Sequence, residues 1–268
     1  MTDLAKTFRD LHHADQPLIL ANAWDAGSAK LIESLGASAV ATTSAGIDWA
    51  LGYPDGNLLP VARLAEMAAA ITRLIRIPLS VDFEAGYSDD PAAVAENIKP
   101  LLDSGVVGIN IEDGGNAPAL LAAKIERVKQ VASAKGVGLF VNARTDIYLR
   151  GLVSEEKRVA ESLARATIYR AAGADGLFVP GLTAKDGIAA IVKGAGLPVN
   201  LLAWPELAPA AELGALGVKR ISAGSGIAQR VWAEAERLAR DFLKDGKSEP
   251  LAVGGMDYGR LQHLFAAR

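Results

Sequence analysis

The amino-acid sequence predicts an α/β protein folded as a single (β/α)8 barrel of the TIM type. Short apolar strands alternate with amphipathic helices along the whole chain, eight such strands are present, and no change in composition marks a domain boundary. We therefore assign residues 1–268 to one domain, with the barrel in residues 1–244 and a connector with a short helix in residues 245–268. A doubly wound sheet is the alternative, but no strand is followed by the G-x-G-x-x-G turn of dinucleotide-binding folds.

The expected strands are short segments, most of them rich in aliphatic residues, as buried parallel strands favour. In chain order they are residues 18–23, 39–43, 77–84, 107–111, 138–143, 176–179, 199–203 and 219–223. The run 77–84 is unusual because it ends in two acids, Asp82 and Glu84, which point to the same side of an extended chain.

Amphipathic segments between these runs predict the helices. They cover residues 28–35, 60–74, 91–104, 117–135, 154–172, 185–194 and 226–243. Pro91 suits the first turn of its helix, and Gly36 suits the end of the helix before it. A long polar loop is expected between the second strand and residue 60, and a short amphipathic segment over residues 256–265 follows the connector.

Composition excludes several classes of function. The chain has 28 Lys and Arg against 31 Asp and Glu, a formal charge of −3 and no basic run, so nucleic acid is not an expected partner. No apolar run reaches the roughly 20 residues of a membrane span, and the charged start does not resemble a signal peptide, so we expect a cytoplasmic protein. The absence of cysteine removes disulfides and thiolate chemistry. Three histidines, expected at the surface, are too few for a histidine-rich metal site: His12, His13 and His263.

Charged residues close the middle strands of the predicted barrel. They are Asp82 and Glu84, Glu112 and Asp113, and Arg144 and Asp146, with Asp55 in the long loop. The carboxyl ends of barrel strands meet at one mouth, where several carboxylates repel each other unless a divalent cation lies between them. Oxygen ligands favour Mg2+, with Mn2+ as the alternative. Taken singly, Glu112 also suits a helix cap and Arg144 an ion pair with Asp146, but together the charges favour a site.

Four motifs resemble signatures of the isocitrate lyase and phosphoenolpyruvate mutase superfamily. They are Val81-Asp82-Phe83-Glu84-Ala85-Gly86-Tyr87, Ile111-Glu112-Asp113, Asn142-Ala143-Arg144-Thr145-Asp146 and Leu51-Gly52-Tyr53-Pro54-Asp55. The resemblance spans nearly the whole chain in the same order. It implies a barrel, Mg2+ dependence and a small 2-oxo acid or enolpyruvate substrate. It also implies that the eighth helix is exchanged between subunits of a dimer of dimers, so we expect a homotetramer.

The same resemblance assigns roles to individual residues. The metal residues are Asp82 as the direct ligand and Glu84 and Glu112 acting through waters, and Glu84 departs from the superfamily, which more often has Asp there. The backbone of Thr43, Ser44, Ala45 and Gly46 is implied to bind the substrate carboxylate together with Arg144. Asp55, Arg144 and Glu112 are the implied catalytic residues.

The loop after Glu112 narrows the choice among the reactions of the superfamily. Lyases of the superfamily carry a Lys-Lys/Arg-Cys-Gly-His loop there, and mutases carry a longer loop with lysine and asparagine, whereas this chain offers only Asn116 before a helix. A short lid favours C–C cleavage of an oxaloacetate-like acid, by decarboxylation or hydrolysis, through a metal-stabilised enolate. The alternatives are C–P chemistry, of the carboxyphosphonoenolpyruvate phosphonomutase or phosphonopyruvate hydrolase type, and a metal-binding barrel without activity.

Overall fold

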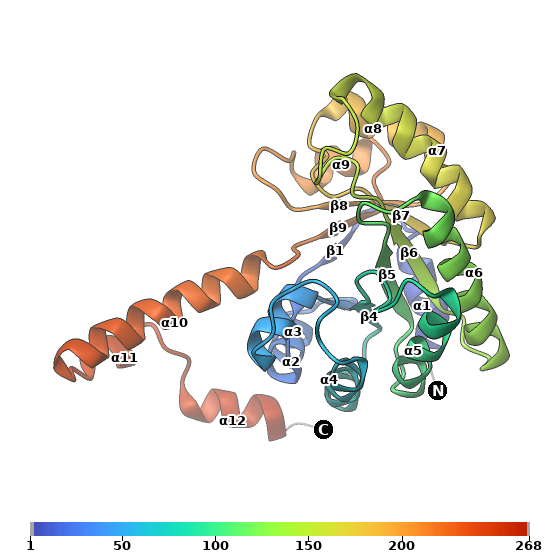
Figure 1. Ribbon diagram of the computed structural model, residues 1–268. Helices are drawn as coiled ribbons and strands as arrows, with labels where there is room; N and C mark the ends of the chain where they lie inside the picture. The colour runs from blue at the N-terminus through green and yellow to red at the C-terminus, as the bar shows by residue number, and fades with distance from the viewer. Residues whose placement is uncertain (1–2, 267–268) are drawn as a thin grey trace.

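The computed structural model describes residues 3–266, whose parallel strands form one nearly closed barrel surrounded by helices (Figure 1). The strands are β1 (Leu18–Leu20), β2 (Asn22–Ala23), β3 (Val40–Thr42), β4 (Leu79–Asp82), β5 (Gly108–Glu112), β6 (Phe140–Arg144), β7 (Gly176–Phe178), β8 (Val199–Leu202) and β9 (Arg220–Ser222). β1 pairs with β9 and β2 pairs with β3, so these two pieces together act as the single first strand that the sequence predicts. The predicted barrel is confirmed.

Helices follow the strands around the barrel. They are α1 (Leu4–Leu11), α2 (Ala26–Ser34), α3 (Ser44–Leu51), α4 (Val61–Leu74), α5 (Pro91–Asp103), α6 (Pro118–Ala134), α7 (Arg158–Ala171, preceded by the 3-10 turn Glu155–Lys157), α8 (Lys185–Ala195), α9 (Ala210–Ala215), α10 (Gly226–Asp245), α11 (Glu249–Ala252) and α12 (Tyr258–Ala266). None of the described helices is both long and apolar enough to cross a membrane.

Between residues 18 and 244, two helices were not predicted from the sequence. Part of the expected polar loop is the helix α3, which begins after the extended Thr43 and ends at Gly52 in the left-handed conformation. Its first five residues are all buried against the barrel, so it shows no amphipathic stripe by which the sequence could reveal it. The six-residue helix α9 was also not predicted, because it is too short for a periodic pattern to stand out.

The helix α1 closes the amino-terminal end of the barrel. Phe8 is fully buried and meets the Phe140 ring edge-on at 5.6 Å. Gly108 leaves room for Phe8, because a Cβ at that position would lie 2.4 Å from the Phe8 ring. The surface position expected for His12 is wrong: its ring is buried, stacks on Phe140 at 4.0 Å and bonds the Phe8 carbonyl through Nδ1. Burial lowers the pKa of His12 to about 3, so the ring stays neutral.

Replacing Phe8 with alanine should lower the free energy of unfolding by roughly 3–5 kcal/mol, because it empties a fully buried aromatic position. The partly exposed Leu4 on the same helix is the matched control, and Leu4→Ala should cost less. Urea denaturation measures both. Retained ligand binding in the folded Phe8→Ala variant is expected, because Phe8 lies at the end of the barrel opposite the strand carboxyl ends.

Candidate active site

A cavity of about 200 Å³ lies at the carboxyl ends of the barrel strands, the end where barrels of this kind place their chemistry. Its lining includes most of the residues singled out from the sequence: Thr43, Ser44, Ala45, Asp55, Asp82 and Arg144. Phe178, Leu202 and Trp204 form apolar parts of the wall. Gly46 does not line the cavity. A Cβ there would lie 2.7 Å from the Trp24 Cβ, so this glycine permits close packing of α3.

Asp82, the last residue of β4, is held by backbone groups at the mouth. Its Oδ2 accepts the Ser44 N–H at 3.4 Å and its Oδ1 accepts the Glu84 N–H at 3.4 Å. Both bonds are long and therefore weak, so the carboxylate keeps capacity for a stronger partner. Burial raises the pKa of Asp82, while the charge of Arg144 opposes that shift.

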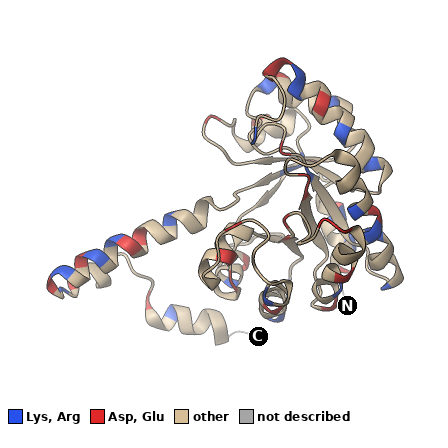
Figure 2. Ribbon diagram, viewed as in Figure 1, with Lys and Arg blue, Asp and Glu red and all other residues tan. Residues whose placement is uncertain are grey.

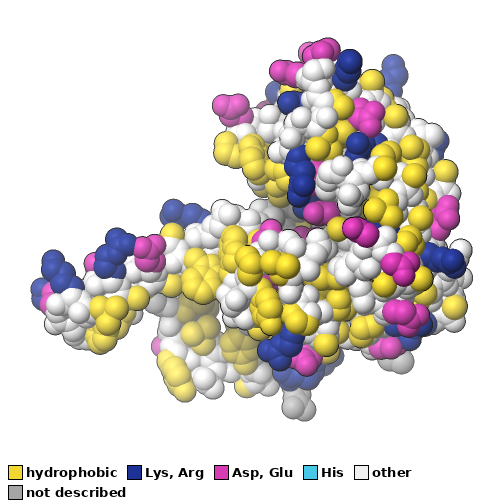
Figure 3. All heavy atoms as spheres, in the orientation of Figure 1, with side chains coloured by type: hydrophobic (Ala, Val, Ile, Leu, Met, Phe, Trp, Pro, Cys, Tyr) yellow, Lys and Arg dark blue, Asp and Glu magenta, His cyan; other side chains and the backbone are white. Residues whose placement is uncertain are grey.

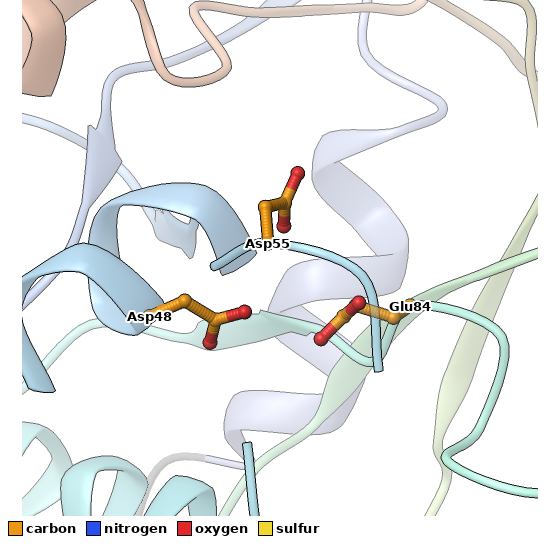
Figure 4. Close-up of side chains that lie close together, drawn as sticks. All are labelled: Asp48, Asp55 and Glu84. Atoms are coloured by element: carbon orange, nitrogen blue, oxygen red, sulfur yellow. The ribbon is translucent and has the colours of Figure 1, made fainter. Parts of the chain in front are cut away.

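Three carboxylates gather near the cavity, and Figure 4 shows those of Asp48 and Glu84 facing each other with Asp55 above them. Asp48, Asp55 and Glu84 each place an oxygen within 4.8 Å of the others. Asp48 is fully buried, and within residues 3–266 neither of its oxygens has a hydrogen-bond partner; Glu84 Oε1 also lacks one there. Asp48 was missed in the sequence because it belongs to the unpredicted helix α3.

The backbone is bent to bring these acids together. Glu84 has a φ of 48° and Asn57 a φ of 60°, both in the left-handed region that non-glycine residues seldom adopt. The Asn57 N–H donates to Glu84 Oε2, and Asn57 Oδ1 accepts the N–H groups of Ala85 and Tyr87. Asn57 therefore ties the loop after α3 to the loop after β4. Such backbone strain is typical of functional sites.

Arg144, at the end of β6, forms ion pairs with two acids at the mouth of the barrel, Asp146 and Glu112. Its Nε and Nη2 donate to Asp146 at 2.6 and 3.2 Å, and its Nη1 lies 2.7 Å from Glu112 Oε2. The ion pair with Asp146 considered in the sequence is therefore present. N–H groups remain on the two terminal nitrogens for a ligand. Burial raises the pKa of Glu112 to about 8 even though Arg144 opposes the shift.

Asp113 points away from the cavity, although the sequence places it at the same strand end as Glu112. Its Oδ2 accepts Arg165 Nη1 at 2.8 Å and the Tyr169 hydroxyl at 2.6 Å, and its Oδ1 accepts the Asp146 N–H at 3.0 Å. Asp113 thus anchors the loop that holds Asp146 to α7, which makes it a scaffold for Arg144.

The donor set fits a hard divalent cation. All the candidate ligand atoms are carboxylate oxygens, and three of the buried ones have no partner among the described residues. Burial and mutual repulsion raise the pKa values of Asp48, to about 7, and of Glu84. A cation would remove the cause of the repulsion.

The loop between β5 and α6 is short, as the sequence predicts. Asn116 N–H closes a turn onto the Asp113 carbonyl, and α6 begins at Pro118. Lys124 does not reach the cavity, because its Nζ donates to the Ala85 carbonyl at 2.9 Å and lies 3.5 Å from Asp89.

Comparisons with known proteins agree with this architecture. Residues 8–243 match the sequence profile of the family described as phosphoenolpyruvate phosphomutase. An uncharacterized protein of Mycobacterium tuberculosis is 38% identical over 260 residues, which span 96% of this chain and 95% of that protein. An oxaloacetate decarboxylase of Bradyrhizobium is 33% identical over 181 residues, 64% of this chain and 60% of that enzyme.

Solved structures share the fold. A Burkholderia cenocepacia protein proposed to be a phosphonomutase has a TM-score of 0.84 at 39% identity, covering 89% of this chain and 100% of that chain. A phosphonopyruvate hydrolase crystallised with oxalate and Mg2+ has a TM-score of 0.85 at 21% identity, over 98% and 95% of the two chains. At the lower identity the likeness concerns the fold alone.

Proposed function

The chain belongs to the phosphoenolpyruvate phosphomutase family, and from that premise we propose that it is an Mg2+-dependent enzyme that cleaves a C–C bond in a small 2-oxo acid of the oxaloacetate type. One observation carries the proposal: a 200 Å³ cavity that brings Asp82 and Arg144 together with the start of α3. Oxaloacetate decarboxylases among the relatives support the substrate class.

The metal residues proposed are Asp82 as direct ligand, with Glu84, Glu112 and Asp55 holding its waters. The convergence of Asp55 and Glu84 with the unpartnered Asp48 supports an ion close to this group, with Asp48 as an additional acid. When bound, Mg2+ supplies Lewis-acid stabilisation of negative charge on the 2-oxo oxygen. Mn2+, which accepts the same oxygen ligands, is the alternative.

The residues of the chain orient the substrate. The N–H groups of the first turn of α3, at Ser44 and Ala45, have no partners within the helix, and the Ser44 N–H makes the long 3.4 Å bond to Asp82. They carry the positive end of the helix dipole, which suits the substrate carboxylate. Arg144 offers its remaining N–H groups from the opposite side. In decarboxylation the C3–C4 bond breaks, its electron pair moves to the 2-oxo group, CO2 leaves, and a proton from water completes pyruvate at C3.

The short lid separates this reaction from C–P chemistry. The name of the family and the Burkholderia structure favour a phosphonomutase or phosphonopyruvate hydrolase as second candidate. Against it, the described residues that line the cavity include no lysine, and Lys124 donates to the Ala85 carbonyl.

Product analysis tests the proposal. The purified chain would be incubated with Mg2+ and with oxaloacetate, phosphonopyruvate, methylisocitrate and dimethylmalate in parallel, with chelator in a matched set. Pyruvate and CO2 from oxaloacetate, lost with chelator, is the expected result, and oxalate and acetate would indicate hydrolysis instead. Turnover of phosphonopyruvate alone would favour the second candidate, and no turnover of any acid would leave a metal-binding barrel.

Mg2+ should stabilise the protein more at high pH than at low pH. The folded pKa values of Asp48 and Glu112, about 7 and about 8, lie above the ordinary values of 3.8 and 4.5, so the metal-free folded state binds more protons than the unfolded chain between these values. The metal-free fold therefore loses stability as the pH rises from the ordinary pKa values to the folded ones. A cation displaces those protons, which is easier at higher pH. Thermal melts with and without Mg2+ at pH 6 and pH 8.5 should show the larger increase in Tm at pH 8.5. Asp48→Asn should reduce the difference, and a Mg2+ effect independent of pH would contradict the prediction.

The position of α10 supports exchange of this helix between subunits. α10 projects away from its own barrel, and α11 and α12 turn back so that α12 lies against α2 (Figure 1). Acidic and basic residues alternate along α10 (Figure 2), and hydrophobic side chains collect along its lower edge (Figure 3). Val231 and Trp232 are about half exposed, at 50% and 49%, and Ile19 on the outer face of β1 is 54% exposed. We propose that α10 of one subunit covers β1 and α2 of another.

Light scattering should give the mass of a tetramer at micromolar concentration. Deleting residues 247–268 should shift the protein to smaller species, and Trp232→Glu should do the same because it places a charge on the apolar face of α10. Arg237→Glu, on the charged face, is the control and should leave the mass unchanged. A monomeric mass for the unaltered chain would contradict the exchange.

A further inference from the structure

Arg220 is a fully buried cation at the base of the cavity. It begins β9, and its side chain is 0% exposed. Among residues 3–266, no carboxylate oxygen lies within the 4.0 Å of an ion pair with its guanidinium. Its Nε donates to Ser222 Oγ at 3.3 Å and its Nη2 to Asn110 Oδ1 at 3.2 Å, while Nη1 has no hydrogen-bond partner in the described part of the chain. Both of these hydrogen-bond partners, Ser222 and Asn110, line the cavity.

Such an arrangement is unfavourable for the fold taken alone. Moving a charge out of water costs several kcal/mol unless a partner charge and good hydrogen bonds offset it, and the two bonds of Arg220 are long and to neutral groups. Burial accordingly lowers the pKa of Arg220, with Asp82 the one acid that opposes the shift. The buried charge of Arg220 would be offset by a negatively charged ligand bound in the cavity.

Arg220 also fixes the orientation of Asn110. The Asn110 Oδ1 accepts both Arg220 Nη2 and Asn142 Nδ2, the latter at 2.9 Å. With its oxygen held by two donors, Asn110 keeps its amide nitrogen, a pure donor, for a ligand in the cavity that it lines. Ser222 continues the network, since its hydroxyl accepts from Arg220 and donates to Asn200 Oδ1 at 3.0 Å.

We propose that Arg220 is a positioning residue that makes the cavity floor bind an anionic oxygen, by presenting the amide donor of Asn110 and by placing an unneutralised positive charge beneath it. This inference rests on the proposed function, because the anion it serves is a 2-oxo acid or the enolate formed from it. It differs from the role of Arg144, which is paired with two acids at the mouth of the cavity.

Calorimetric titration of the full chain with oxalate in the presence of Mg2+ tests the inference. Arg220→Met keeps the length of the side chain but removes charge and donors, and should weaken oxalate binding about ten-fold or more. Arg220→Lys keeps the charge but not the forked donor geometry of the guanidinium, so its oxalate affinity should lie between those of the wild type and Arg220→Met. In an Asn110→Ala background, Arg220→Met should cost less affinity than in the wild type, because part of its effect passes through Asn110. Arg220→Met should melt no lower than the wild type, since it removes a buried, unpaired charge.

The outcomes separate this inference from the proposed function. Equal oxalate affinity in the wild type and Arg220→Met would overturn it, whatever the melting temperature, and so would a wild type that binds no oxalate. If Arg220→Met does not fold, Arg220→Lys is the deciding variant. An oxalate affinity of Arg220→Lys equal to that of the wild type would then overturn the inference. Oxalate binding that depends on Arg220 in a protein that releases no CO2 from oxaloacetate would instead refute the proposed substrate and leave the cavity floor as inferred.

Discussion

Replacing Asp82 with alanine should abolish measurable Mg2+ binding and reduce turnover of a 2-oxo acid by about three orders of magnitude or more. Asp82 is the acid that lies in the cavity between the start of α3 and Arg144, and the long hydrogen bonds to its oxygens leave them free for a cation. Loss of the direct ligand removes both the metal and the charge stabilisation that the metal supplies. Calorimetry with Mg2+ and a decarboxylation assay measure the two effects.

The stability of the same variant shows whether the effect is local. Asp82 is one of several acids whose charges repel each other, so removing it should leave the metal-free melting temperature within a few degrees of the wild type. Glu84→Ala is the matched comparison and should weaken Mg2+ binding less than Asp82→Ala does, because a carboxylate that acts through water contributes mainly by orienting the waters on the metal. Unchanged Mg2+ affinity in Asp82→Ala would contradict the assignment of Asp82 as direct ligand and would place the ion at Asp48, Asp55 and Glu84.

The strands of the barrel were predictable because their signal is local. Runs such as Leu79–Val81 and Ile109–Ile111 are buried and largely aliphatic, with one polar residue each, as strands covered on both faces favour. A charged residue, Asp82 or Glu112, follows each run. The same pattern located Asp82 and Arg144, which line the cavity. Side chains at the carboxyl ends of parallel strands share one edge of the barrel whatever the loops do, so their proximity follows from the fold alone.

Residues whose roles depend on packing were not predictable in this way. Asp48 belongs to a helix without an amphipathic stripe, and its proximity to Glu84 depends on a left-handed backbone at Glu84 and Asn57. His12 reads as polar in the sequence, yet it is buried because α1 closes the barrel and Phe140 offers a stacking surface. Arg220 begins a strand where a cation commonly faces solvent, and only closure of the barrel turns it inward.

Replacing Arg144 with lysine should reduce oxalate affinity and turnover about 100-fold while lowering the melting temperature only modestly. The lysine keeps a positive charge between Glu112 and Asp146, which now lie 2.7 and 2.6 Å from the guanidinium. It cannot hold Asp146 with two donors and at the same time direct further N–H groups at a substrate carboxylate. Affinity for the ligand should therefore fall more than stability does.

Arg144→Met is the comparison that separates binding from folding. Without any charge at this position, the one ion pair left to the fully buried Asp146 among the described residues is with Arg150, at 3.2 Å, and Glu112 loses its ion pair with Arg144. Removing one member of a buried ion pair commonly costs 3–5 kcal/mol, so Arg144→Met should melt well below both Arg144→Lys and the wild type. If Arg144→Lys were destabilised as strongly as Arg144→Met while its folded fraction bound oxalate normally, Arg144 would serve the scaffold formed with Asp146 and Asp113, and the substrate carboxylate would have to be held by the start of α3 alone.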